Sequence, residues 1–396
     1  MLKYIDRHNT DSRKWDGMDA TFSSGELLPL WVADMDFETM PAVKDALKDF
    51  VDAAPFGYYY PREEYFEAIM DWEETHHGHK IDRNSICFAP SVVAAFNWIL
   101  LMATRPGDSV ILLTPIYGPM KKAIVNNDRK FVECPLIHKG DTYEIDFDDF
   151  EAKIKNNNVK LFILCSPHNP VGRVWREAEL VKLMEICRRY NVLVISDEIH
   201  HDFCFGIHKH TPTVCCGNYK NFVITLTSAS KTFNLAGCKN AIVIIEDEKL
   251  RAMYKDFTTR IAISDGSSFG YVAVEAAYKN GADWLGDVKD VIWENYNLVK
   301  DAFAESLPKV VVGKLEGTYL LWIDFSAYFE SEESLKYFME NVCGLAFDYG
   351  SWFGTGYDCF IRMNLATSRE NVEMATAQII AELQKIGLYG YQDNAN

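Results

Sequence analysis

The sequence has no apolar run of about 18 residues, no Cys-x-x-Cys pair, no internal repeat and no low-complexity tract. The first absence argues against a membrane-spanning helix. The first ten residues are polar and charged, so we expect no signal peptide. Basic residues are also not in excess, since the formal net charge is −17. Proteins that bind nucleic acid or anionic membranes normally carry a basic patch, so we expect neither partner.

Ten cysteines are present, but they are scattered, and several stand inside strand-like or helix-like runs. In such runs cysteine behaves as a small apolar residue. Because we expect no signal peptide, we interpret the cysteines as free thiols in a reducing cytosol and predict a cytoplasmic location. The adjacent pair Cys215 and Cys216 leaves a redox or metal-binding role open.

The chain has 396 residues, of which 48% are hydrophobic. One hydrophobic core usually stops growing at about 250–300 residues, so we expect one large and one smaller domain. Strand-like runs that are continuous and β-branched alternate with helical patterns, which predicts an α/β fold with a mainly parallel sheet covered on both faces. The strand-like runs are 86–89, 109–115, 159–167, 192–198, 222–228 and 241–245, and the helical segments are 41–53, 62–76, 91–103, 177–190 and one that starts near 118.

The pattern changes after residue 281. Residues 282–306 predict one long helix, and the remainder combines strand-like runs with helices near 333–341 and over 369–387. We interpret this part as a smaller α+β domain that the N-terminal residues join. The predicted division is 46–281 for the large domain, and 1–45 together with 282–396 for the smaller domain.

Open parallel sheets bind ligands at the carboxyl ends of their strands, so the residues directly after each strand-like run are candidates. Lys231 carries an amine that could form a Schiff base. Asp197 could pair with a pyridinium nitrogen and keep it protonated. Asn169 could donate a hydrogen bond to a ring oxygen, and Tyr117 could stack on the face of that ring.

A phosphate would also find partners at these positions. Ser228 and Ser230 could donate hydrogen bonds to it, and Ser91, Val92 and Val93 open a predicted helix whose first N–H groups would favour an anion. Together, these residues are the parts needed to hold an aromatic, anionic cofactor that carries an aldehyde.

Each of these residues also has an ordinary structural interpretation. A single lysine after a strand is usually a surface charge, and Asp197 is as often a helix cap as a ligand. Asn169 before a proline commonly marks a turn, and Tyr117 is ordinarily a packed loop aromatic. Only their joint occurrence at successive strand ends favours a site.

Three segments, "SASKTFNLAG", "SDEIHHD" and "PHNPVGRVW", resemble the signature segments of fold-type I pyridoxal 5′-phosphate (PLP) enzymes, the aspartate aminotransferase superfamily. The resemblance extends over nearly the whole chain and implies the aspartate aminotransferase-like PLP-dependent transferase fold. Four further segments, at 28–37, 56–65, 208–212 and 316–325, resemble the MalY/PatB group of cystathionine β-lyase-like carbon–sulfur lyases.

The resemblance implies PLP as the cofactor, Lys231 as the Schiff-base lysine, and Lys231, Asp197 and Tyr117 as the catalytic residues. Asn169 and Arg362 would bind substrate, with the planar fork of Arg362 gripping the α-carboxylate; the ordinary alternative for this arginine is a strand-end salt bridge.

Ala33 would line the substrate side of the site. Tyr58 would reach the phosphate bound by a partner subunit, which implies a homodimer with shared active sites.

The chain departs from the superfamily pattern at two positions. His200 stands where many relatives have a tyrosine, and its role is either a ring-oxygen partner or an indirect one. Lys239 stands where many aminotransferases have an arginine, and a lysine can still neutralise phosphate as a point charge. Histidines are frequent in this region, but their spacing matches no zinc signature, so we expect no metal.

The MalY/PatB-like segments imply a carbon–sulfur β-lyase that cleaves L-cystathionine or related cysteine S-conjugates to a thiol, pyruvate and ammonia. An aminotransferase acting on an L-amino acid is the first alternative, because the same residues would serve it. A regulatory binding protein with reduced catalysis is the second alternative, although the presence of Lys231, Asp197 and Arg362 argues against it.

Overall fold

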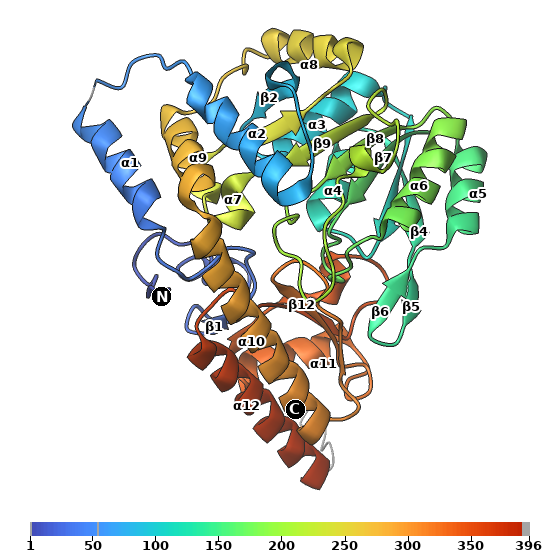
Figure 1. Cartoon of the computed structure of the whole chain (residues 1–396). Helices are drawn as coiled ribbons and strands as arrows, with labels where there is room; N and C mark the ends of the chain where they lie inside the picture. Colours follow the sequence, from blue (N-terminus) through green and yellow to red (C-terminus); the bar gives the residue numbers. More distant parts are fainter. Residues whose placement is uncertain (1, 54, 390–396) are drawn as a thin grey trace.

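The computed structural model describes residues 2–53 and 55–389, which build two main sheets of unequal size, joined by a long helix, and two small two-stranded sheets (Figure 1). The larger sheet has seven strands in the order β2-β10-β9-β8-β7-β3-β4. Only β10 runs against its neighbours, so the sheet is mainly parallel, as predicted. Its strands are β2 (Ile86–Ala89), β3 (Ser109–Thr114), β4 (Lys130–Pro135), β7 (Val159–Cys165), β8 (Leu193–Asp197), β9 (Val223–Thr227) and β10 (Ala241–Ile244).

Helices cover both faces of this sheet, which explains why its strands read as continuous apolar runs. Along β7, Phe162 and Leu164 pack into one buried cluster with α5 and α6, while Leu161 and Ile163 pack into another with α3, α4 and α8. Successive side chains of a strand point to opposite faces, so burial of both faces requires apolar residues throughout. These helices are α3 (Val92–Ala103), α4 (Gly118–Asn126), α5 (Phe147–Asn157), α6 (Glu177–Arg189) and α8 (Glu248–Arg260).

The smaller sheet is antiparallel, in the order β11-β12-β15-β14, and the N-terminal segment joins this region. There β1 (Leu28–Pro29) pairs in parallel with β13 (Leu345–Ala346). The long helix α10 (Ala282–Ser306) lies alongside α12 (Arg369–Tyr389) in the lower half of Figure 1. The four strands of the sheet are β11 (Val311–Val312), β12 (Leu320–Asp324), β14 (Asp348–Tyr349) and β15 (Phe360–Asn364).

The remaining helices pack where the two parts meet. Helices α2 and α9 share one buried apolar cluster with α10 and the smaller sheet. No helix among the described residues is long and apolar enough to cross a membrane. The remaining elements are α1 (Pro41–Asp52), α2 (Glu63–His77), α7 (Ala229–Thr232), α9 (Ser268–Asn280), α11 (Glu332–Tyr337) and the hairpin β5 (Ile137–Lys139)–β6 (Thr142–Glu144).

The sequence pattern predicts most of these elements, with one difference in type. The helix expected near 333–341 is α-helical only over α11 and continues as a π-helical turn at Phe338–Val342. The long helix at 282–306 is confirmed to the residue. The division into domains at residues 45/46 and 281/282 stays a prediction.

Candidate active site

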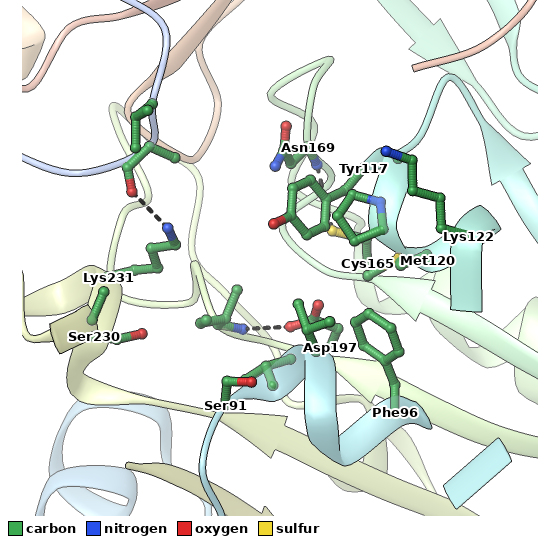
Figure 2. Close-up of a pocket in the computed structure, with 18 of the residues that line it drawn as sticks. Ser91, Phe96, Tyr117, Met120, Lys122, Cys165, Asn169, Asp197, Ser230 and Lys231 are labelled. Carbon is green, nitrogen blue, oxygen red and sulfur yellow. Dashed lines mark hydrogen bonds between the residues drawn. The ribbon is translucent and has the colours of Figure 1, made fainter. Parts of the chain in front are cut away.

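A cavity of about 930 Å³ opens where the carboxyl ends of β7, β8 and β9 face the N-terminal segment and the smaller sheet (Figure 2). Every site residue predicted from the sequence lines this cavity except Tyr58. The lining residues predicted in advance are Ala33, Ser91, Val92, Val93, Tyr117, Asn169, Asp197, His200, Ser228, Ser230, Lys231, Lys239 and Arg362.

Lys231 lies on α7, the short helix that begins two residues after β9 ends. Its half-buried side chain extends into the cavity, where Nζ donates a hydrogen bond of 2.6 Å to the carbonyl oxygen of Ala33 (Figure 2). Burial, with a contribution from Arg362, lowers the pKa of the amine to about 8, although Asp34 and Asp197 act in the opposite direction. A substantial fraction of this amine is therefore neutral near pH 8, as a nucleophile or base must be.

Asp197 is the last residue of β8 and is buried at the floor of the cavity. Its Oδ1 accepts a hydrogen bond of 3.2 Å from the backbone N–H of Ile199. Burial, reinforced by Glu198, raises the pKa of this carboxyl to about 7, and the opposing effect of Lys231 does not compensate. The carboxylate therefore lacks a close cationic partner within the described chain.

Arg362, on β15, is buried and held from several directions. One terminal nitrogen donates a hydrogen bond of 2.8 Å to Oδ1 of Asn169. The other forms an ion pair with Asp348, which lies opposite Arg362 in the register of β14 and β15. The guanidinium stands 4.8 Å over the ring of Phe353, while Nε is buried with no hydrogen-bond partner among the described residues. A fixed guanidinium with a spare donor is suited to a carboxylate ligand.

One side of the cavity gathers backbone donors and hydroxyls. Ser91 caps α3, and its hydroxyl accepts from the N–H of Ala94, which leaves the first-turn N–H groups of Val92 and Val93 without partners inside the helix. Helix N-termini of this kind favour anions. The exposed Lys239 also lines the cavity, with φ of 53°.

The two serines of the Lys231 turn also stabilise the turn itself. The Ser228 hydroxyl donates 2.7 Å to the carbonyl oxygen of Asn240 and accepts from the N–H of Ser230. Its predicted donation to a phosphate would require this hydroxyl to rotate, and it stays a prediction.

Tyr117 and His200 provide aromatic walls. Tyr117 lies directly before α4, is half-buried, and lies beside Asn169 with its hydroxyl directed into the cavity in Figure 2, and burial raises the pKa of this hydroxyl. Burial, helped by the charges of Lys231 and Arg362, holds the pKa of His200 well below its ordinary value, so its imidazole is neutral. Its Nδ1 is buried without a partner among the described residues.

Tyr58 lies outside the cavity, on a segment where its side chain is fully exposed. The sequence analysis also missed three residues of the site. The carbonyl oxygen of Trp31 accepts a hydrogen bond of 3.4 Å from Arg362, and Asp348 forms the ion pair with the same side chain. Asn240 accepts from the Tyr65 hydroxyl at 3.0 Å and keeps a buried, unpartnered Nδ2.

The paired cysteines lie elsewhere and are not activated. Burial raises the pKa of Cys215 to about 11 and that of Cys216 to about 12, and nearby Glu198 adds to both shifts. A thiol reacts as its thiolate, so both are poor nucleophiles at neutral pH.

Comparison with known proteins gives a consistent result. The chain is 37% identical over 382 residues to cystathionine beta-lyase PatB of Bacillus subtilis, covering 96% of this chain and 99% of that one. It is 31% identical over 388 residues to the protein MalY of Escherichia coli, covering 97% and 98%. The crystal structure of cystalysin from Treponema denticola, which contains a pyridoxal 5′-phosphate cofactor, matches with a TM-score of 0.93 at 35% identity, covering 97% and 98%.

The match to a known family spans most of the chain. Residues 26–379 fit the family described as aminotransferase class I and II, and the fold is the aminotransferase-like fold that the sequence segments implied. The chain therefore belongs to the class I and II aminotransferase family.

Proposed function

We propose that the protein is a PLP-dependent carbon–sulfur β-lyase, which cleaves L-cystathionine or related cysteine S-conjugates to a thiol, pyruvate and ammonia. Its long and well-covered similarity to relatives named cystathionine beta-lyase supports this activity. One structural observation carries the proposal: a weakly basic lysine amine and a buried carboxyl without a close cationic partner line one cavity.

The residues of the cavity fit PLP. The raised pKa of Asp197 indicates a carboxylate that needs a cation, and a protonated ring nitrogen would supply one. The N-terminus of α3, Ser230 and Lys239 would hold the phosphate, while Tyr117 and Asn169 would contact the ring. When bound, PLP supplies an aldehyde that bonds to an amine and a protonated ring that withdraws electrons from the substrate α-carbon.

The chain's own residues would then move the proton and orient the substrate. Arg362 would bind the α-carboxylate, and its contacts with Asp348 and Asn169 restrict the guanidinium to one orientation. Lys231 Nζ, in its neutral form, would take the proton from the substrate α-carbon as a general base. The electron pair freed at that carbon would form a double bond to the β-carbon while the thiolate leaves with the electrons of the C–S bond, and water would hydrolyse the resulting enamine to pyruvate and ammonia.

A matched pair of substrates tests the reaction type. S-Ethyl-L-cysteine and L-norleucine have nearly the same shape, but only the first has a thiolate leaving group at the β-carbon. We expect pyruvate, ammonia and ethanethiol in equal amounts from S-ethyl-L-cysteine without any added keto acid, and no pyruvate from L-norleucine. The measurement is a coupled pyruvate assay with parallel thiol detection.

An aminotransferase would behave differently in the same assay. If both compounds are consumed only when a keto acid is added, and at similar rates, the protein is an aminotransferase and the lyase proposal is wrong. If neither compound is consumed under any condition, although the cofactor is bound, the regulatory-protein alternative gains support instead.

We further propose that the protein is a homodimer in which Tyr58 reaches the partner's phosphate site. In the single chain, the Tyr58 and Tyr60 side chains are 112% and 79% exposed, and Phe56 near them is 58% exposed and makes tilted ring contacts with Phe50 and Phe269. Exposed aromatic patches of this kind usually mark interaction sites. The predicted cytoplasmic location remains an expectation from the sequence.

Complementation tests the shared site. Tyr58→Ala and Lys231→Ala chains should each be nearly inactive alone, whereas mixed dimers contain one site with both native residues. We therefore expect co-expression of the two variants to restore pyruvate release that neither has by itself. A sedimentation mass of one chain, or no activity in verified mixed dimers, would contradict the proposal.

A further inference from the structure

The turn that carries Lys231 is anchored at both ends by one pair of buried residues. At its start, Oγ1 of Thr227 lies 3.2 Å from Nε2 of His201. At its end, Oγ1 of Thr232 donates a 2.5 Å hydrogen bond to Oδ2 of Asp202. The two anchors are themselves in contact, since Nε2 of His201 lies 3.2 Å from the same carboxylate oxygen.

We propose that the His201–Asp202 pair positions Lys231, by holding both ends of the turn whose residues face the cavity. The turn between the two threonines contains Ser228, Ser230 and Lys231, all of which line the cavity, whereas neither His201 nor Asp202 does. The inference deepens the proposed function, because it assigns to this pair the task of keeping the amine aligned with the reacting carbon.

The local sequence explains how one loop serves both sides of the turn. After β8 ends at Asp197, the chain bends, with the N–H of His201 bonded to the carbonyl oxygen of Glu198. This bend directs Asp197 and His200 into the cavity and places His201 and Asp202 behind the Lys231 turn. The loop thus sets the position of Asp197 and that of Lys231 together.

Helix α2 supports Asp202 from the opposite side. Its Oδ1 accepts hydrogen bonds from Nε1 of Trp72 at 3.1 Å and from Nε2 of His77 at 2.9 Å. Although burial alone would raise it, the pKa of Asp202 is held well below its ordinary value by His201 and His77. The carboxylate is therefore charged and tied to two elements that are distant in sequence, which makes it a firm anchor.

His201 carries the complementary charge. Burial lowers the pKa of its imidazole, but the carboxylates of Asp202 and Glu73 more than offset this effect and raise it to about 9. At neutral pH the ring is an imidazolium, whose Nε2–H faces both Asp202 and Thr227. Charge-assisted hydrogen bonds of this type are shorter and stronger than neutral ones.

A metal centre is the competing interpretation of this cluster. Ligand atoms of His77, His201 and Asp202 lie within 4.8 Å of one another, as do those of Glu198, His201 and His210. However, the side chains are already paired as imidazole and carboxylate, for example His210 Nε2 with Glu198 Oε2 at 2.8 Å. Each of these carboxylates thus already has an imidazole partner without a cation, which favours the positioning role.

The test compares Thr232→Val with Thr232→Ser. Valine has nearly the shape of threonine without the hydroxyl, whereas serine keeps the donor to Asp202. Because Thr232 is buried and does not line the cavity, its variants act only through the turn. For Thr232→Val we expect kcat to fall about 10- to 100-fold with KM within about threefold of wild type, since misplacing a catalytic group by about 1 Å costs rate rather than affinity. For Thr232→Ser we expect both kcat and KM to stay within about threefold of the wild-type values.

Two further readouts separate positioning from general damage. In the full-length valine variant, amide hydrogen exchange of residues 228–233 should accelerate while the rest of the large sheet is unchanged. The pH midpoint of the visible absorption change of the lysine-bound cofactor should shift in the valine variant and not in the serine variant. Thr376→Val is the matched control, because this buried threonine donates only within α12.

Several results would overturn the proposal. Equal losses in the valine and serine variants, or a valine variant with native kcat and native exchange, would show that the hydroxyl does not position the turn. If the valine variant does not fold, Asp202→Asn changes the other partner of the same hydrogen bond. Hydrogen exchange of residues 228–233 is then compared between Asp202→Asn and wild type, and unchanged exchange would contradict the proposal. One metal ion per chain by native mass spectrometry, lost in His77→Ala, would make the cluster a metal centre instead.

Failure of the proposed function would look different from failure of this inference. If wild type eliminates no thiol from any cysteine conjugate, the lyase proposal is wrong, while the exchange rates of the Thr232 variants still report whether the pair holds the turn.

Discussion

Replacing Lys231 by alanine is expected to lower kcat for pyruvate release by about 10⁴-fold or more, because the change removes both the amine that bonds the cofactor and the base that takes the α-proton. The lowered pKa of this amine, about 8, indicates that the wild-type group can exist as a neutral base close to physiological pH. The measurement is single-turnover and steady-state pyruvate release from S-ethyl-L-cysteine.

The control for this prediction is Lys249→Ala, which removes an exposed lysine from the first turn of α8 and should leave turnover unchanged. Borohydride reduction followed by peptide mapping should place the cofactor on Lys231 in wild type and nowhere in the variant. Native turnover by Lys231→Ala, or a reduced adduct on another side chain in active wild type, would exclude the mechanism proposed above.

The sheet could be predicted well from sequence because its strands are buried on both faces. Runs such as 161–165 are apolar and buried at every position, and they stand out against the amphipathic helices between them. The hairpin β5–β6 and the strand β4 were missed for the opposite reason. All three residues of β5 are exposed, and β4 alternates between exposed and buried positions, so neither gives a continuous apolar signal.

Site residues at the ends of strands could be predicted from the sequence. Site residues that act through contacts between segments far apart in the sequence could not. Asp197 is the last residue of β8, and Lys231 lies on the short helix that follows β9, and the parallel arrangement brings such positions together. Asp348 has no local signal, because it acts through cross-strand register with Arg362. The carbonyl oxygen of Ala33 accepts a hydrogen bond from Lys231, which is 198 residues away in the sequence. Every residue has a backbone carbonyl, so the pattern of side chains cannot indicate which one makes this contact.

The two buried aspartates near the Lys231 turn illustrate why motif position alone does not fix a role. Asp197 ends β8 and Asp202 stands five residues later in the loop that follows, and both are almost fully buried. One lacks a close cationic partner and the other has two imidazoles, so their pKa values move in opposite directions. This contrast leads to a prediction in which activity and stability change in opposite senses.

Asp197→Asn is expected to lower kcat/KM about 10³-fold and yet to stabilise the cofactor-free protein. Asparagine cannot keep a ring nitrogen protonated, which removes a preorganised electrostatic contribution to the transition state. The pKa of this carboxyl rises from 3.8 to about 7 in the folded protein, so the folded chain holds a proton that the unfolded chain has released. The contribution of this carboxyl to the stability of the cofactor-free wild type therefore falls as pH rises from about 4 to about 7.

At pH 8 the ionised carboxylate costs roughly 4 kcal/mol in the free energy of unfolding, and the neutral amide removes most of this cost. Urea unfolding of the cofactor-free proteins should show the variant more stable than wild type at pH 8, with the difference shrinking toward pH 4. Asp202→Asn is the matched comparison. We expect it to lower the free energy of unfolding at pH 8, because His201 and His77 stabilise the charged form of Asp202 in the folded protein. If both substitutions shift stability in the same direction, the opposite environments assigned to these two carboxyls are wrong. If Asp197→Asn keeps full activity, this carboxyl does not hold the proton on the ring.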